Sequence, residues 1–158
     1  MSRIAVFVFL AASACFVIWL GHGLPDDVAS HFDGAGRPDG SMSRAGFVGT
    51  MIGMAVALPL AMLLLLPRLR DASRPSVPAA GRWSAPASSQ PAMGPGEAAA
   101  FAAGLSAFMD FAGWRVAAAN AIPSAAALSM PAMWVGTAVF LAFVAAWSVW
   151  LVARRRRR

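Results

Sequence analysis

Hydrophobic and polar residues form long separate blocks along the chain, without the short periods that mark the half-buried helices and strands of a soluble domain. Residues 4–20, 45–66 and 133–152 are almost wholly apolar and carry no charge. A helix of about 20 apolar residues is long enough to cross the roughly 30 Å of hydrocarbon in a bilayer. Each of the three blocks therefore predicts a membrane-spanning helix.

The second apolar block contains three local signals. Ser43 precedes it and is a suitable N-cap. Pro59 lies inside it and lacks a backbone donor, which predicts a kink. Gly49 and Gly53 form a G-x-x-x-G pair, a weak sign that another helix approaches closely at this place. We therefore expect a capped and kinked helix.

A fourth block, residues 98–119, is long enough to span but carries Asp110 and Arg115. Each charge costs about 2.5–3.5 kcal/mol at the centre of a span, so hydropathy alone leaves this block undecided between a span and a surface helix. The positions of the arginines favour a span. Arg3 places the N-terminus in the cytoplasm, and the terminal run Arg154–Arg158 returns to that side only if residues 98–119 also cross. The sequence thus predicts an all-α integral membrane protein with four transmembrane helices and both termini cytoplasmic.

The predicted spans divide the chain into three parts. Residues 1–70 hold the first two spans and, at 21–44, a short structured outer loop. Residues 71–97 are rich in Pro, Ser, Ala and Gly and cannot bury a core, which predicts a flexible cytoplasmic linker. Residues 98–158 form a helix pair, with spans at 98–119 and 133–152, an outer turn at 122–132 and a basic cytoplasmic tail.

The composition is that of a membrane protein, and the distribution of charge favours lipid over nucleic acid as a partner. The chain of 158 residues is 59% hydrophobic, with a mean hydropathy of +0.64 and a net charge of +6. Five of the positive charges lie in Arg154–Arg158, beside a span, where they indicate orientation and contact with anionic lipid headgroups and do not indicate nucleic acid. The single cysteine, Cys15, excludes an intramolecular disulfide. The segment LAASAC is compatible with a lipoprotein or signal-peptidase site, but the apolar run continues beyond it as FVIWL, which favours an uncleaved span.

The outer loop holds the densest polar chemistry of the chain, with four of the seven acidic residues and both histidines. Val28–Phe32 alternates and predicts a short strand, whereas residues 33–41 predict two turns in series with glycines able to take positive φ. The candidate ligand-binding or sensing residues are His31, Asp33, Asp39 and Asp26. His31 and Asp33 lie two apart and share one side of a strand, and Asp27, Asp39 or His22 could complete a metal set. Because no metal motif fixes this spacing, a structural loop is favoured and no metal or cofactor is predicted.

Asp110 and Arg115 are the second group of candidates, because ionisable residues within a span are functional or pair with one another. Their separation of five residues does not place them ideally on one helix face, so we expect each to find its partner on another helix or in the outer loop. A structural role is favoured over transport. The sequence contains no arrangement of nucleophile and base, and no phosphate-binding glycine motif, so a non-enzymatic protein is predicted.

The outer loop resembles the signature of a known family. The stretch LPDDVASHFDGAGRPDGSMSR is similar to the pattern L-P-D-x-V/I-x-x-H-F/W-x-x-x-G-x-P-D-G followed by a basic residue. This pattern marks a bacterial membrane domain, the domain of unknown function 1648, and occurs in SdpI-type immunity and signalling proteins. The matching residues are Leu24, Pro25, Asp26, Val28, His31, Phe32, Gly36, Pro38, Asp39, Gly40 and Arg44.

Further along, AAANAIPSAAALSMPA resembles a less specific family pattern, an Asn before the outer turn and the last span. Two departures from the signature are Ala29, where members usually carry a second Pro, and Ser41-Met42, where they often carry Trp-Gly. The resemblance implies a multi-pass protein of the bacterial inner (plasma) membrane that senses or binds an extracytoplasmic ligand or toxin and has a membrane or extracytoplasmic protein partner. The alternative is a small transporter, or an accessory subunit of a transport complex, that uses Asp110 and Arg115.

Overall fold

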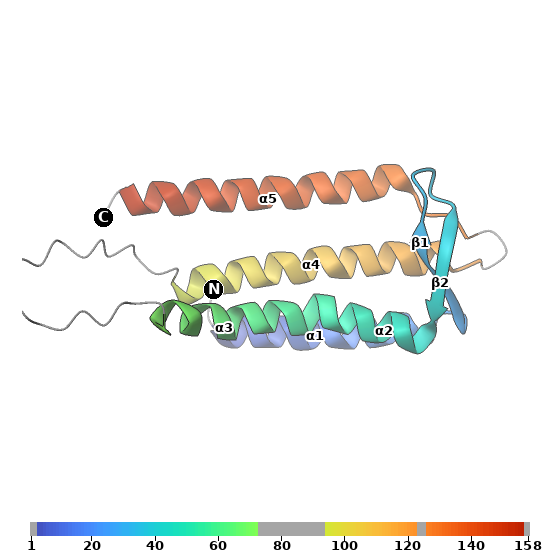
Figure 1. Ribbon diagram of the computed structural model, residues 1–158, viewed down its shortest axis with the longest axis horizontal. Helices are drawn as coiled ribbons and strands as arrows, with labels where there is room; N and C mark the ends of the chain where they lie inside the picture. The colour runs from blue at the N-terminus through green and yellow to red at the C-terminus, as the bar shows by residue number, and fades with distance from the viewer. Residues whose placement is uncertain (1–2, 73–93, 123–125, 157–158) are drawn as a thin grey trace, which may run out of the picture.

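The computed structural model describes residues 3–72, 94–122 and 126–156, which form a bundle of long helices with a small β-hairpin across one end (Figure 1). The helices and strands follow the order α1 (Arg3–His22), β1 (Asp27–Phe32), β2 (Pro38–Ser43), α2 (Arg44–Ile52), a π-helical turn η1 (Gly53–Ala57), α3 (Leu58–Ala72), α4 (Pro95–Ala119) and α5 (Met130–Arg156).

Three helices contain stretches long and apolar enough to cross a membrane, as the sequence predicts. These stretches are Ile4–His22, Arg44–Leu65 and Met130–Arg154. The helix α4, predicted as the fourth span, is less apolar and is not among the helices that qualify as spans by length and hydropathy. It nevertheless runs alongside the other helices over the length of the bundle (Figure 1).

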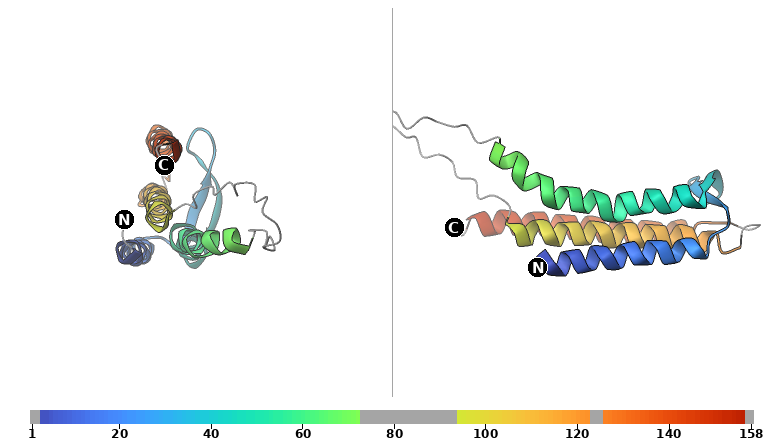
Figure 2. Two further views of the ribbon diagram at one scale, coloured as in Figure 1. Left: turned by 90° about the vertical axis from the view of Figure 1, so that its left-hand side faces the viewer. Right: turned by 90° about the horizontal axis from the view of Figure 1, so that it is seen from below.

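The central position of α4 explains its low hydropathy. It lies between α5 on one side and α1 and the α2–α3 helix on the other, as the end-on view of Figure 2 shows. Its buried face is made of small side chains, which allow neighbouring helices to approach closely: Ala98, Ala99, Ala102, Ser106 and Gly113. Alanine and serine contribute little to a hydropathy score, so the residues that suit close packing also make this helix look weakly apolar.

The core consists of two clusters stacked along α1, α4 and the α2–α3 helix. The cluster near the hairpin contains Val17, Val28, Phe47 and Met51, and parts of α4 pack against it. The cluster at the opposite end contains Val6, Leu10 and Ala99. The helix α5 lies outside both clusters and contacts α4 along one face, through the stacked rings of Phe108 and Phe140 and the tilted rings of Phe101 and Trp147.

The N-cap predicted at Ser43 is confirmed, and the irregularity predicted at Pro59 takes the form of a π-helical turn. The Ser43 hydroxyl accepts a hydrogen bond from the Gly46 amide, which is the N-cap expected from the sequence. Around Pro59 the chain widens into the π-helical turn, in which the Leu58 amide bonds to the Gly53 carbonyl five residues back. Pro59 has no amide to donate, and the wider turn accommodates this without breaking the helix. The helix curves along its length (Figure 2).

The close helix approach suggested at Gly49 and Gly53 does not occur among the described residues. A side chain built at either glycine would have nothing within 4 Å. Glycines of other helices do allow close approach, since a Cβ at Gly104 of α4 would overlap the Phe143 ring and one at Gly136 of α5 would overlap the Phe111 ring. The motif was a poor guide because spacing does not say which face of a helix meets a neighbour.

The all-α expectation was wrong for the outer loop. The strand predicted at Val28–Phe32 is confirmed within β1, but Pro38–Ser43, predicted as part of two turns, is a second strand. The strands pair antiparallel with Val28 opposite Met42, and an irregularity near His31 shifts the register. The segment Pro38–Ser43 forms a strand and not turns, because pairing with β1 satisfies the backbone donors and acceptors of both segments. Among the described residues only Gly36 takes a positive φ, at +79°.

Two sequence predictions fall outside the described residues. Most of the linker predicted at 71–97, and part of the outer turn predicted at 122–132, lie there. The helix α4 begins at Pro95, three residues before the predicted span, and Glu97 forms a capping box with the Gly94 amide. At the same end of the bundle Glu97 pairs with Arg154 of the basic tail, which fastens α5 to the start of α4.

Candidate functional site

The hairpin lies across the ends of the helices and packs its apolar side on the bundle (Figure 1). Val28 is fully buried, and its cross-strand neighbour Met42 packs against the same core cluster. The hairpin is therefore a folded cap, with one side joined to the core and the other facing away from it.

Asp33 is used by the turn of the hairpin. Its Oδ1 atom accepts hydrogen bonds of 2.9 Å from the backbone amides of Ala35 and Arg37, and its Oδ2 atom pairs with the Arg37 guanidinium at 2.8 Å. The backbone hydrogen bond from Arg37 lowers the pKa of Asp33 below its usual value against the opposing effect of desolvation, with help from the Arg37 side chain and the Ala35 amide. This carboxylate is committed to holding the turn in shape.

Asp26 is used in a similar way at the other end of the hairpin. Its carboxylate lies 2.6 Å from the Arg44 Nη2 atom, and the Arg44 amide donates to the Asp26 carbonyl at 2.9 Å. These bonds tie the entry of β1 to the first residue of α2. The carboxylate is almost fully exposed, so the pair fixes geometry more than it stabilises the fold.

His31 and Asp39, the other two predicted loop residues, are exposed on the strands. His31 lies opposite Gly40, whose lack of a side chain leaves room for the imidazole. Neither side chain has a hydrogen bond or ion pair within the described part of the chain, so both are open to a ligand. No three His, Cys, Asp or Glu side chains come together there in a way that could hold a metal ion, so the metal set considered from the sequence is not assembled.

Asn120, at the end of α4, binds the hairpin and was not among the predicted site residues. Its Oδ1 atom accepts from the Ala29 amide and its Nδ2 atom donates to the Ala29 carbonyl, both at 2.9 Å. The same Nδ2 atom also donates to the Val116 carbonyl, one turn earlier in α4. The side chain is only 3% exposed, so β1 is anchored to α4 by a buried amide. The signal in the sequence was its place in AAANAIPSAAALSMPA, the family-like pattern of an Asn before the outer turn and the last span.

Gly36 anchors the tip of the hairpin to the segment before α5. The Leu128 amide donates to the Gly36 carbonyl at 2.9 Å, and a Cβ at Gly36 would overlap the Leu128 carbonyl oxygen. Together with Asn120 and Arg44, this contact connects the hairpin to α2, α4 and α5.

Asp110 finds its partner on another helix, as expected. It accepts a hydrogen bond of 2.8 Å from Ser13 of α1, and Ser106 donates in turn to the Ser13 hydroxyl at 3.2 Å. Both serines are buried, at 3% and 0% exposure. This short polar chain lies inside the bundle and joins α1 to α4.

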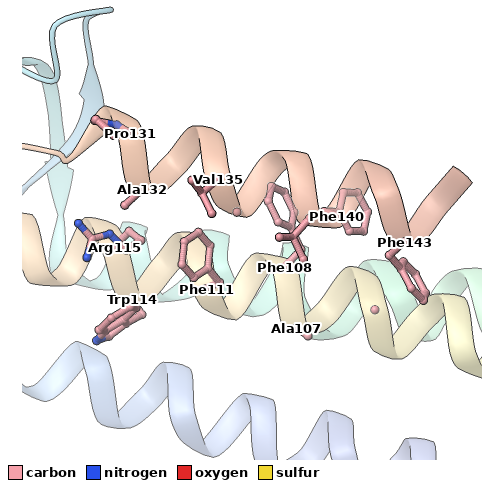
Figure 3. A pocket seen from close by; sticks show the side chains of 13 residues that line it. Ala107, Phe108, Phe111, Trp114, Arg115, Pro131, Ala132, Val135, Phe140 and Phe143 are labelled. Atoms are coloured by element: carbon pink, nitrogen blue, oxygen red, sulfur yellow. The ribbon is translucent and has the colours of Figure 1, made fainter. Parts of the chain in front are cut away.

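Arg115 does not pair with Asp110. Its guanidinium lies over the Trp114 ring, 5.3 Å from the ring centre, and its Nε atom is buried without a hydrogen-bond partner among the described residues. The two intramembrane candidates therefore belong to separate sites, Asp110 facing α1 and Arg115 lying between α4 and α5 (Figure 3).

Comparison with known proteins finds a family match for an N-terminal part of the chain. No curated protein and no solved structure matches the chain. Residues 8–63 match the model of the domain of unknown function DUF1648. This match covers most of α1, the hairpin with its signature residues, and the helix that follows through the π-helical turn. With its long apolar helices, the protein is a membrane protein of unknown function, and its residues 8–63 are similar to the DUF1648 family.

Proposed function

We propose that this protein is a non-enzymatic, multi-pass protein of the bacterial plasma membrane that senses an extracytoplasmic ligand or toxin through its hairpin, in the manner of SdpI-type immunity and signalling proteins. The observation that carries the proposal is the attachment of the hairpin to α2, α4 and α5 by Arg44, Asn120 and Gly36. A ligand that moves this cap would shift the ends of several helices together.

The exposed side of the hairpin supplies the contacts for such a ligand. His31 and Asp39 are exposed and have no partner within the described residues, whereas Asp26 and Asp33 hold the backbone around them. In this division of roles, His31 and Asp39 bind and the two other carboxylates position them. A rigid scaffold that presents a few polar side chains is the usual arrangement for recognition by a loop.

The proposed topology has four crossings, with both termini cytoplasmic and the hairpin outside. The 25 residues of α4 extend for about 37 Å at the usual helical rise, enough to cross about 30 Å of hydrocarbon. One end of α4 pairs with Arg154, next to the arginines proposed to bind anionic headgroups, and the other end holds the hairpin. Arg37 and Arg44 on the outer side both pair with carboxylates, whereas the run Arg154–Arg158 concentrates positive charge at the inner end.

The test is complementation in cells that lack the gene. Cells carrying the wild-type chain, His31→Ala with Asp39→Ala, or Asp110→Ala are challenged with spent medium of the parent strain, and survival is measured. We expect the hairpin variant to lose protection and Asp110→Ala to retain it, at equal amounts of protein in the membrane. Equal survival of all strains, including the one without the gene, contradicts the proposal.

The chain of Ser13, Asp110 and Ser106 favours a second candidate, a small transporter or an accessory subunit of one. A carboxylate inside a bundle, hydrogen-bonded between helices, is a common feature of ion pathways. This candidate predicts the reverse result, in which Asp110→Asn abolishes uptake of a cation into vesicles while the His31 and Asp39 variants leave it unchanged.

A further inference from the structure

An apolar groove runs between α4 and α5, and Asp110 does not line it. It has a volume of about 780 Å³, which lies within the range of roughly 300–1,000 Å³ typical of small-molecule sites. Its walls are aromatic rings from both helices, among them Phe108, Phe111, Phe140 and Phe143 (Figure 3).

The groove exists because two glycines let rings from the opposite helix enter deeply. Phe111 of α4 packs onto Gly136 of α5, and Phe143 of α5 packs onto Gly104 of α4. These contacts hold the helices together at two heights and leave a space between them. Val135 and Val139, which line the groove on α5, are 64% and 65% exposed, so the groove is open to the surrounding lipid.

A cationic group closes the hairpin end of the groove. Arg115 lines it there, opposite Pro131 and Ala132 of α5 (Figure 3). The guanidinium contacts only the Trp114 ring, the Nε atom is buried without a partner, and no acidic residue lines the groove in the described part of the chain. Arg115 lies four residues, about 6 Å along the axis, before the end of α4, so that in a spanning α4 its long side chain can extend to the lipid headgroups.

We propose that this groove binds an anionic phospholipid from the hairpin-side leaflet, with one acyl chain among the rings and its phosphate on Arg115. Apolar walls with one positive group at the headgroup end complement an amphiphile that has a negative head and an apolar tail. An arginine binds a phosphate through two parallel hydrogen bonds, which would satisfy the buried Nε atom or the terminal amines. The inference rests on the proposed crossing of the membrane by α4, and it is independent of ligand binding by the hairpin.

The first experiment uses the full chain in nanodiscs of phosphatidylcholine with increasing fractions of phosphatidylglycerol. Native mass spectrometry counts the lipids retained after release from the disc. We expect one phosphatidylglycerol to be retained about tenfold more strongly than phosphatidylcholine, the change expected for one charge-assisted hydrogen bond. Equal retention of the two lipids means ordinary boundary lipid and overturns the proposal, whatever any variant does.

The second experiment locates the bound chain. In a variant that keeps Trp114 as its only tryptophan, phospholipids with brominated acyl chains quench its fluorescence when they occupy the groove. We expect saturable quenching by brominated phosphatidylglycerol, loss of its preference over phosphatidylcholine with Arg115→Gln, and weaker quenching with Val139→Phe, which adds volume at an exposed position of the groove. Arg37→Gln removes the same charge from the hairpin and is the matched control, expected to behave like the parent.

Three results would contradict the lipid assignment in this second experiment. Quenching that Arg115→Gln leaves unchanged shows that charge does not select the occupant. Displacement of phosphatidylglycerol by a single-chain fatty acid at a lower concentration assigns the groove to a free amphiphile. Protection of Trp114 that increases with protein density, together with cross-linked dimers through α5, assigns it to a second copy of the chain.

Discussion

The side-chain amide of Asn120 pairs with the main chain of Ala29 as a neighbouring strand would, accepting from its amide and donating to its carbonyl, each at 2.9 Å. A side chain at the end of α4 thus makes the two hydrogen bonds to β1 that a neighbouring strand would otherwise make. Because Asn120 is buried, the two main-chain groups have no water to replace it. The amide therefore joins the family domain at residues 8–63 to the helix pair that follows it.

Replacing Asn120 by Ala should detach the hairpin from α4. Two part-buried backbone groups lose their partner, and an unsatisfied buried group costs about 1–3 kcal/mol, so we expect a loss of about 2 kcal/mol in unfolding free energy. Hydrogen exchange of the Ala29 amide should accelerate more than exchange within α1. The control is Ser148→Ala, whose exposed hydroxyl bonds only to its own helix at Val144 and should change stability by less than about 0.5 kcal/mol. An unchanged Ala29 exchange rate in Asn120→Ala would contradict the anchoring role.

Gly36→Ala should loosen the tip of the hairpin. At a φ of +79°, a residue with a side chain costs about 1–2 kcal/mol, and the new methyl group also overlaps the Leu128 carbonyl. We expect faster exchange of the Leu128 amide and a destabilisation of at least about 1 kcal/mol. Gly34→Ala, two residues earlier with nothing within 4 Å, is the matched control and should leave both quantities nearly unchanged. Similar effects at both glycines would mean that the turn, and not the contact with Leu128, is sensitive.

The pH dependence of the hairpin turn follows from Asp33. Its pKa is lower in the folded chain than the ordinary value of 3.8, so its contribution to stability is complete above that value and is lost as the pH falls through the lower, folded pKa. The Ala35 and Arg37 amides should therefore exchange faster below pH 3.8 than above it, relative to an unstructured peptide. Asp33→Asn should remove this pH dependence. Asp39→Asn, at an exposed position without a hydrogen bond in the described chain, should retain it.

The sequence predicted the features that depend only on residues close together in the chain. Uniform apolar runs predicted three spans, Ser43 predicted a cap, and Pro59 predicted an irregular turn, because each depends on the covalent structure of a few neighbouring residues. The strand at Val28–Phe32 followed from alternation in the same way.

What the sequence left undetermined depends on contacts between distant segments. The strand at Pro38–Ser43 reads as turns until β1 is placed beside it. Asn120 becomes a site residue only when Ala29, 91 positions earlier, is packed against it. The glycines that meet neighbouring rings are Gly104 and Gly136, because facing partners, and not spacing, decide which glycine is used. The partners of Asp110 and Arg115 likewise come from other helices.

The hydrogen bond between Ser13 and Asp110 should make a measurable contribution to the packing of α1 on α4. Interhelical hydrogen bonds in membranes average about 0.6 kcal/mol and reach about 1.7 kcal/mol, so a double-mutant cycle of Ser13→Ala and Asp110→Ala should give a coupling energy in that interval. Steric trapping or unfolding in mixed micelles measures the four stabilities. Cys15→Ala, at an exposed position two residues along α1, replaces Ser13→Ala in the control cycle and should give a coupling below about 0.5 kcal/mol. If both cycles give the same value, Asp110 acts on α1 through the general packing of the helix and not through the serine hydroxyl.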